Sequence, residues 1–353
     1  MNWIIQSQGM IIPRNPNASI ADTTGYTIFN MHSLTKTPIS QDTAHGIFSH
    51  HFGSSSLISA FQELTDGFYN SAYFFELTDG KRWVLKIAPN PSIKIMQYEK
   101  EILRTEVDVL RLVKSKTELP VPFIAANDYT HSILENDYFI MEFMDGIPLN
   151  KLRDSLAENE AHAIDERTGY YLRQMNGIEG TVFGNYSRPE LSSINWHEAF
   201  TLMLRSVLED GQSEGVILPV DYKSIQSQIF EHLSCLEEVQ TPRLVHWDLW
   251  DGNIFVDPVT KQITGLIDFE RALWADPLME ANFGAFGINP SFLNGYGVKM
   301  LTSPKQKERR SLYNIYLYLI MIIECYFRKY ETDQQENWAR EKLMTELEIL
   351  NSY

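Results

Sequence analysis

Alternation of apolar and polar positions marks the early part of the chain as strand-forming. The segments Ser71–Leu77 (SAYFFEL) and Arg82–Ile87 (RWVLKI) are rich in aromatic and β-branched residues, which favour strands. Between them lies Thr78–Lys81 (TDGK), whose Asp-Gly step is a strong signal for a tight hairpin turn. The pattern therefore predicts an antiparallel pair of strands.

A helix and a further strand are predicted after this hairpin. Between Ile93 and Lys114 the apolar positions share one helical face, and the extended segment Leu119–Pro122 ends the pattern. A strand is expected at Tyr138–Glu142. The early part of the chain should therefore be a sheet with a helix against it.

Helical spacing dominates from about Ile147 onward. Helices are predicted at Leu156–Met175, Trp196–Glu209 and Tyr222–Val239, with two more after about Ser303. Short apolar segments interrupt this pattern and predict a small β-element at Arg243–His246, Ile254–Val256 and Ile263–Ile267.

These patterns together predict an α+β fold of two lobes. Residues 41–145 would form a sheet-rich N-terminal lobe, and residues 146–353 a larger, mainly helical C-terminal lobe. The boundary should fall near Asp145 and Gly146. Residues 1–40 form an N-terminal extension that the pattern does not place.

Charge and cysteine content limit the partners and the compartment. The 353-residue chain has 46 acidic and 30 basic residues, a formal charge of -16, which disfavours nucleic acid or an anionic membrane as a partner. Cys235 and Cys325 form no disulfide framework, and the segment Met1–Pro13 lacks the pattern of a signal peptide, so we expect a cytoplasmic protein. The apolar segment Leu312–Phe327 is too short to span a bilayer and predicts a buried helix. The oligomeric state stays open.

The most informative polar residues border the small β-element. The segment from His246 to Asn253 reads HxDxxxxN, and Asp268 follows at the end of the next predicted strand. Phosphoryl transfer requires a carboxylate that orients the attacking hydroxyl and oxygen ligands for Mg2+. Asp248 suits the first role, while Asn253 and Asp268 suit the second. His246 would brace the loop. A single His-x-Asp pair would carry little weight, but the ordered set predicts a phosphotransferase.

These residues resemble the aminoglycoside phosphotransferase family, part of the protein-kinase-like superfamily that includes choline and fructosamine kinases. The resemblance covers roughly residues 50–330. It implies a bilobal kinase-like fold, ATP or GTP as co-substrate, Mg2+, and transfer of the γ-phosphoryl group to a hydroxyl of a small molecule. The acceptor would be aminoglycoside-like or another polar metabolite, and the acidic composition weakly favours a cationic one.

Two alternatives stay open at this point. The segment Asp248–Asn253 resembles the DLWxGN segment of fructosamine kinases, so an acceptor of that class is compatible with the sequence. A non-catalytic, nucleotide-binding regulator is the other alternative, although none of Asp248, Asn253 and Asp268 is missing. A protein kinase is disfavoured because Asp268-Phe269-Glu270 replaces DFG and no Ala-Pro-Glu follows.

The resemblance also assigns a nucleotide site. Lys86 lies in an apolar strand, where a charge is costly unless paired, and it matches the lysine that holds the α- and β-phosphates. Its expected partner is Glu106, which faces inward between Leu103 and Leu110. Glu99 is the second choice.

The remaining nucleotide contacts belong to a covering loop and a hinge. The loop residues are Gly67, Asn70 and Ser71, with fewer glycines than in protein kinases. In the hinge the resemblance places Met141 behind the adenine, and it assigns the adenine hydrogen bonds to the Glu142 carbonyl and the Met144 amide.

Carboxylates that could line the acceptor site are Asp251, Glu270 and Glu324. For Asp251 and Glu270 a structural role is favoured. Glu324 could equally be buried beside a polar partner. Asp276, which precedes a proline, is expected to cap the next helix.

Overall fold

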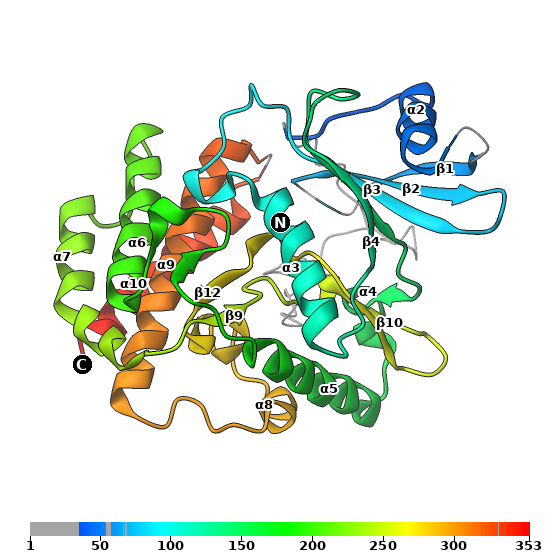
Figure 1. Cartoon of the computed structure of the whole chain (residues 1–353). Helices are drawn as coiled ribbons and strands as arrows, with labels where there is room; N and C mark the ends of the chain where they lie inside the picture. Colours follow the sequence, from blue (N-terminus) through cyan, green and yellow to red (C-terminus); the bar gives the residue numbers. More distant parts are fainter. Residues whose placement is uncertain (1–34, 54–57, 66, 68, 331) are drawn as a thin grey trace, which may run out of the picture.

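The computed structural model describes residues 35–53, 58–65, 67, 69–330 and 332–353. A sheet with its helices forms one part, at the upper right of Figure 1, and the larger helical part lies to the left and below. The catalytic segment predicted from the sequence lies where these parts meet.

The N-terminal part is built on a five-stranded antiparallel sheet in the order β1-β2-β3-β5-β4. Its strands are β1 (Ile58–Leu64), β2 (Ser71–Leu77), β3 (Arg82–Ile87), β4 (Ile124–Asp128) and β5 (Tyr138–Glu142). The predicted hairpin is confirmed, because β2 and β3 pair from Ser71↔Ile87 to Glu76↔Arg82. Its turn depends on Gly80, whose φ of 83° favours glycine.

Helices cover both faces of this sheet. On one face α2 (Gln41–Phe52) buries Ile47 and Phe48 against Phe75 of β2. On the other lies α3 (Ile102–Lys116), with Val107 and Leu110 in the main core. The predicted helix was expected to begin near Ile93. It begins later because Glu101 adopts a left-handed φ of 59°, which an α-helix does not accommodate.

The last residues before α2 run along the sheet, and we call residues 35–40 the N-terminal strap. The Thr37 amide donates to Ser71 Oγ at 2.6 Å, and the Thr37 hydroxyl donates to the Ala88 carbonyl at 3.2 Å. The Ile39 amide donates to the Tyr73 hydroxyl at 3.1 Å. The described end of the N-terminal extension is therefore part of the sheet-rich lobe.

The C-terminal part consists mainly of helices, namely α4 (Leu149–Leu152), α5 (Glu158–Asn176), α6 (Trp196–Ser213), α7 (Tyr222–His232), α8 (Pro290–Tyr296), α9 (Pro304–Arg328) and α10 (Gln334–Leu350). The predicted helix Tyr222–Val239 is shorter than expected, since α7 ends at His232 and continues as the 3-10 turn Leu233–Glu238. Almost all of α9 is buried, as predicted for Leu312–Phe327. Among the described residues no helix combines the length and apolarity that a membrane crossing requires.

Two small sheets hold the segment that carries the polar motif. One has the order β11-β10-β6 and contains β6 (Ile147–Pro148), β10 (Ile254–Val256) and β11 (Ile263–Leu266). The other has the order β8-β7-β12-β9 and contains β7 (Phe183–Asn185), β8 (Ser192–Ser193), β9 (Arg243–Val245) and β12 (Leu273–Ala275). β7, β8 and β12, each of two or three residues, were not predicted because strands this short carry little pattern, whereas the equally short β9 and β10 were predicted as apolar segments.

The chain passes from the large sheet into these small sheets through Asp145 and Gly146. Gly146 has a φ of 121°, and a Cβ there would lie 2.9 Å from the Val256 carbonyl oxygen of β10. Glycine is thus required at the crossing both by conformation and by space. We retain this point as the proposed boundary of the lobes.

Helices α5 and α8 approach so closely that a glycine at their contact is expected to be essential for stability. A Cβ added at Gly295 of α8 would overlap the Glu166 carbonyl of α5. Gly295→Ala should therefore force the backbones apart and lower the free energy of unfolding by about 1–3 kcal/mol, measured by urea denaturation. As the control, Gly46→Ala lies in the exposed part of α2 with nothing within 4 Å, and should stabilise by about 0.5–1 kcal/mol. Equal midpoints for Gly295→Ala and the wild type would contradict this interpretation.

Candidate active site

The catalytic loop between β9 and β10 is held from behind by a carboxylate that the sequence analysis missed. Glu280 is fully buried, and it accepts the His246 amide at 2.8 Å and the Trp247 amide at 2.9 Å. Asn176 of α5 also donates to it, at 3.2 Å. These contacts hold Trp247 at a left-handed φ of 61°, a conformation uncommon for a bulky residue. The only sequence signal for Glu280 was its closeness to Asp276, which caps the following turn as predicted by accepting the Leu278 amide.

His246 braces the loop as a neutral imidazole. Its Nε2 lies 3.2 Å from the Ile267 carbonyl, to which it donates, and its Nδ1 accepts the Asp248 amide at 3.2 Å. Burial lowers the pKa of His246 to about 4, so the ring is uncharged at neutral pH. The side chain ties the catalytic loop to the strand end before Asp268.

Asp248 is buried at the centre of the loop with one oxygen unused. Its residue is 4% exposed, and its Oδ1 has no hydrogen-bond partner among the described residues. Burial raises the pKa of Asp248 to about 8, with Arg271 opposing and Asp268 adding to the rise. Asn253 donates its amide to the Asp248 carbonyl at 2.8 Å, so its side-chain oxygen is the atom left for another ligand. A poised carboxylate of this kind can accept a proton from a substrate.

Lys86 of β3 forms two ion pairs that join the lobes. Its Nζ lies 2.6 Å from Glu106 Oε2 of α3 and 2.8 Å from Asp268 Oδ1. Burial acts to lower the pKa of Lys86, but Asp268 and Glu106 outweigh it and raise the pKa above its usual value. Of the predicted partners, the structure brings Glu106 to Lys86, whereas Glu99 contacts Arg328 instead.

A cluster of carboxylates lies at this lysine. Oxygen atoms of Glu106, Asp268 and Glu270 all lie within 4.8 Å of one another. Burial raises the pKa of Glu106 to about 7 and that of Glu270 to about 8, and Asp268 adds to both shifts. Burial also opposes ionisation of Asp268, but Lys86 outweighs it and lowers the pKa. One lysine does not balance this cluster, and hard oxygen ligands at this spacing fit Mg2+.

The covering loop lies directly over these carboxylates. Asn70 is buried, and its side-chain amide donates to Glu270 Oε2. Ser71 is also buried, with its Oγ accepting the Thr37 amide of the strap. A Cβ at Gly67 would meet only the Asn70 carbonyl and Lys36 Nζ, both at 4.0 Å. The structure therefore places Glu270 beside Asp268, the predicted metal ligand.

The hinge residues connect the end of β5 to the small sheet β11-β10-β6. Met141 is buried in the main core and pairs with Val84 across β3 and β5. The Glu142 amide donates to the Phe123 carbonyl at 2.9 Å. The Met144 side chain lies against Gly265 of β11, where a Cβ would approach it to 3.0 Å. Adenine recognition by the Glu142 carbonyl and the Met144 amide stays a prediction.

The other two carboxylates predicted for the acceptor site, Asp251 and Glu324, form ion pairs with arginines. Asp251 accepts Arg153 Nε at 2.6 Å. Glu324 of α9 is completely buried, 3.3 Å from Arg271 and 3.6 Å from Arg328. Its placement corresponds to the buried alternative rather than to a free acceptor ligand.

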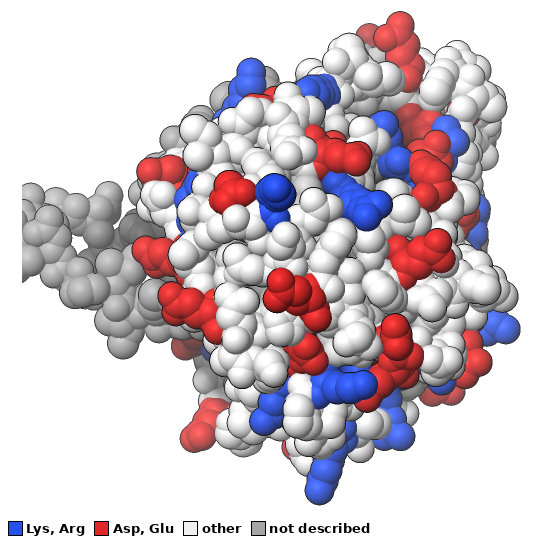
Figure 2. Space-filling model, turned by 90° about the vertical axis from the view of Figure 1, so that its left-hand side faces the viewer, with Lys and Arg blue, Asp and Glu red and all other residues white. Residues whose placement is uncertain are grey.

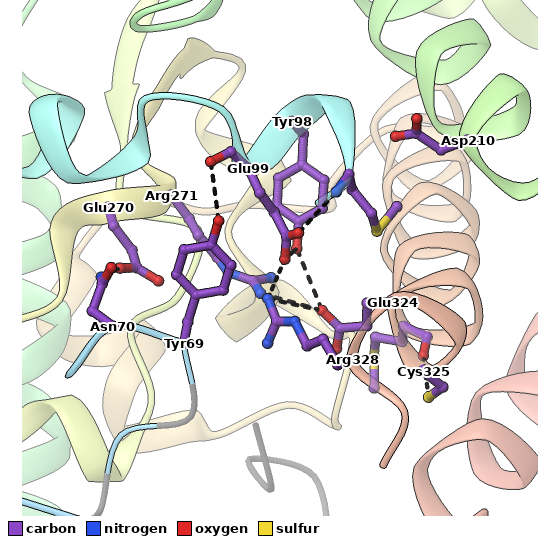
Figure 3. A network of polar contacts seen from close by, with 12 residues as sticks. Tyr69, Asn70, Tyr98, Glu99, Asp210, Glu270, Arg271, Glu324, Cys325 and Arg328 are labelled. Atoms are coloured by element: carbon purple, nitrogen blue, oxygen red, sulfur yellow. Dashed lines mark hydrogen bonds and ion pairs between the residues drawn. The ribbon is translucent and has the colours of Figure 1, made fainter. Parts of the chain in front are cut away.

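Figure 3 shows how Glu324 enters a network that reaches the catalytic segment. Tyr98 donates to Glu324 at 3.3 Å, and Gln335 of α10 donates to it at 2.7 Å. Arg328 also pairs with Glu99, which precedes α3. Burial acts to raise the pKa of Glu324, but Arg328 and Arg271 outweigh it and lower the pKa. The network connects Arg271, which directly follows Glu270, to helices α9 and α10.

Charges on the surface are mixed in sign. Figure 2 shows acidic and basic side chains interspersed over one face of the molecule, without a large patch of either sign among the described residues there. The excess of acidic residues is therefore spread out on this face.

A comparison with known families decides the classification. A sequence model described as the phosphotransferase enzyme family matches residues 60–296, well over half of the 353-residue chain. The chain belongs to this family. Residues of this phosphotransferase inside the matched range include Lys86, Glu106, Asp248 and Asp268.

Similar proteins include kinases of small molecules. The phosphotransferase is 24% identical over 263 residues to a probable ketoamine kinase of Vibrio vulnificus (strain CMCP6), over 72% of this chain and 82% of the relative. A putative fructosamine-3-kinase from Thermobifida fusca YX-ER1 has a TM-score of 0.62 at 18% identity, over 88% of this chain and 100% of that one. The streptomycin–ATP–APH(2″)-IIa ternary complex has a TM-score of 0.59 at 16% identity, over 89% and 99%.

These findings confirm the predicted bilobal, protein-kinase-like α+β fold and the assignment as a small-molecule phosphotransferase. A nucleotide co-substrate follows from that assignment.

The burial of Asp248 predicts a pH-dependent penalty on stability. Its unfolded pKa is about 3.9 and its folded pKa is about 8, so the unfolded state releases this proton first as the pH rises. Ionisation therefore destabilises the folded state increasingly between about pH 4 and 8. Asp248→Asn cannot ionise and should be more stable than the wild type, with a gain that grows by up to about 1.4 kcal/mol per pH unit in this window.

Urea unfolding of both proteins at several pH values measures this effect. Asp257→Asn is the control with the opposite sign, because backbone amides of Thr260 and Val259 lower the pKa of half-exposed Asp257. That variant should lose stability at neutral pH and match the wild type in acid. A gain for Asp248→Asn that is constant with pH would refute the buried-acid interpretation.

Proposed function

We propose that this phosphotransferase transfers the γ-phosphoryl group of ATP to a hydroxyl of a small ketoamine, with Mg2+ and in the cytoplasm. The observation that carries the proposal is the buried Asp248 with its unpartnered Oδ1, held beside Asn253 and the Lys86–Asp268 ion pair. This arrangement combines a proton acceptor with charges suited to phosphates. The buried, unpaired Cys235 and Cys325 support a reducing compartment.

Different residues of the site would have different roles in phosphoryl transfer. Asp248 would accept the proton of the acceptor hydroxyl at Oδ1 and orient its oxygen for attack. Lys86, positioned by Glu106, would bind the α- and β-phosphates. Asp268, Asn253 and Glu270 would hold Mg2+, which neutralises charge on the phosphates when bound.

The ketoamine class is supported by sequence and by the charge of the acceptor side. The relative from Vibrio vulnificus is named a probable ketoamine kinase, and Asp248–Asn253 resembles the DLWxGN segment of fructosamine kinases. Asp251 and Glu324 are neutralised by arginines, so they offer no free carboxylate to a polycation. An aminoglycoside acceptor is the second candidate, favoured by the fold shared with the streptomycin complex.

A panel of acceptors tests the proposed reaction. Purified protein with Mg2+ and either ATP or GTP is given ketoamines, aminoglycosides, amino alcohols and sugars, and ADP or GDP release is measured. We expect ketoamines to give the strongest stimulation. Stimulation by aminoglycosides alone would overturn the acceptor class but not the reaction, whereas nucleotide binding without turnover on any acceptor would favour a non-catalytic regulator.

Asp248→Ala is expected to separate binding from transfer in the same assay. Loss of the proton acceptor should lower kcat by about two or more orders of magnitude while the affinity for ATP is kept. Asp257→Ala, in an exposed turn, is the matched control and should retain the wild-type rate. Transfer that survives Asp248→Ala would remove Asp248 from the role of base.

Asp268→Ala tests the metal role independently of the acceptor. Without this carboxylate the cluster should no longer bind Mg2+ productively, so ATP affinity should lose its dependence on Mg2+. Calorimetric titration with ATP, in the presence and absence of Mg2+, measures the difference. A variant whose ATP affinity still rises with Mg2+ as in the wild type would contradict the assignment.

A further inference from the structure

The N-terminal strap places a second lysine at the covering loop. Lys36 Nζ donates to the Asn70 carbonyl at 2.7 Å, and a Cβ at Gly67 would lie 4.0 Å from the same Nζ. The strap is fixed in this position by the hydrogen bond from the Thr37 amide to Ser71 Oγ. Lys36 therefore reaches the loop expected to cover the nucleotide phosphates.

A short chain of contacts connects Lys36 to the centre of the site. Asn70, whose carbonyl accepts Lys36, donates its side-chain amide to Glu270. Glu270 belongs to the same cluster of oxygens as Asp268, which pairs with Lys86. Lys36 and Lys86 therefore approach one group of carboxylates from separate elements of the N-terminal part.

Among the described residues no carboxylate lies within ion-pair distance of Lys36. None of the ion pairs found between described residues includes Lys36, although its side chain is partly enclosed. A backbone carbonyl accepts one of its protons, but it supplies no negative charge. Because enclosing an unpaired cation is costly, an anion at this position would be stabilised. Burial lowers the pKa of Lys36; Lys86 adds to this shift, and Glu63, Glu270 and Asp268 oppose it without reversing it, so a bound anion would oppose it further.

We propose that Lys36 is a phosphate-binding residue that contacts the terminal phosphates of the nucleoside triphosphate as a second cation beside Lys86. The inference rests on the proposed function, since it requires a nucleotide in this site. It also gives the strap a role: the covering loop is poor in glycine, so it offers fewer close backbone amides than a glycine-rich loop. The ammonium of Lys36 would replace that missing attraction.

A purely structural role for Lys36 makes a different prediction. If the side chain only braces the loop through the Asn70 carbonyl, its loss would weaken binding of every nucleotide alike. If it binds phosphate, the loss would grow with the number of phosphates beyond the α-phosphate. Nucleotides of increasing phosphate number therefore distinguish the two roles.

The experiment measures binding of ATP, ADP and AMP to the full chain with Mg2+, for the wild type, Lys36→Met and Lys36→Arg. Lys36→Met should weaken ATP by about tenfold or more, which corresponds to one lost charge-assisted contact. ADP should be weakened less and AMP not at all, while Lys36→Arg should keep most of the ATP affinity. Lys81→Met is the matched control, because Lys81 lies on the same sheet but is exposed and paired with Asp79, and it should bind like the wild type.

Each other outcome overturns the proposal. Wild-type ATP affinity in Lys36→Met, or an equal loss for ATP and AMP, would leave Lys36 without a phosphate role. Urea unfolding of Lys36→Met, expected to match the wild type, shows whether a loss comes from damage to the fold. These binding measurements need no acceptor. If the wild type binds ATP but transfers phosphate to no acceptor, the proposed function is refuted, whereas the proposed role of Lys36 in phosphate binding can still be tested.

Discussion

The ion pairs of Lys86 with Glu106 and Asp268 are the interaction on which the rest of the site depends. They join β3, α3 and the segment after β11, which are distant in sequence, at distances of 2.6 and 2.8 Å. A buried ion pair of this kind contributes little net stability, because both charges lose their hydration. Its value is positional: it fixes one cation between carboxylates that carry more negative charge than it balances.

Near this centre, hydrogen bonds hold the backbone of the catalytic loop, while one carboxylate oxygen of Asp248 accepts no hydrogen bond from a described residue. Glu280 accepts two backbone amides of the loop, and His246 ties it to the Ile267 carbonyl. Among the residues that the structure describes, none is a hydrogen-bond partner of Asp248 Oδ1. Burying an unpaired acceptor destabilises the folded protein, and the surrounding contacts offset that cost. The same unsatisfied oxygen is what a substrate hydroxyl can use.

Acidic side chains outside the catalytic loop are paired with arginines. Arg271 and Arg328 neutralise Glu324, and Arg153 neutralises Asp251. The network in Figure 3 thereby converts acidic side chains of the C-terminal lobe into connections between α9, α3 and the catalytic segment. At the oxygen cluster, Asp268 is paired with Lys86, and burial raises the pKa of Glu270 to about 8.

The sequence by itself determined the strands of the β2–β3 hairpin, the buried helix α9 and the ordered set His246, Asp248, Asn253 and Asp268. Those features depend on local periodicity and short spacing, which a sequence displays directly. Only the tertiary structure decided that Glu280 supports the loop, that Glu270 lies beside Asp268 and that Lys36 reaches Asn70. The physical reason is that these contacts join residues 34 to 200 positions apart. Their partners are set by packing of the lobes and leave no periodic signal in the chain.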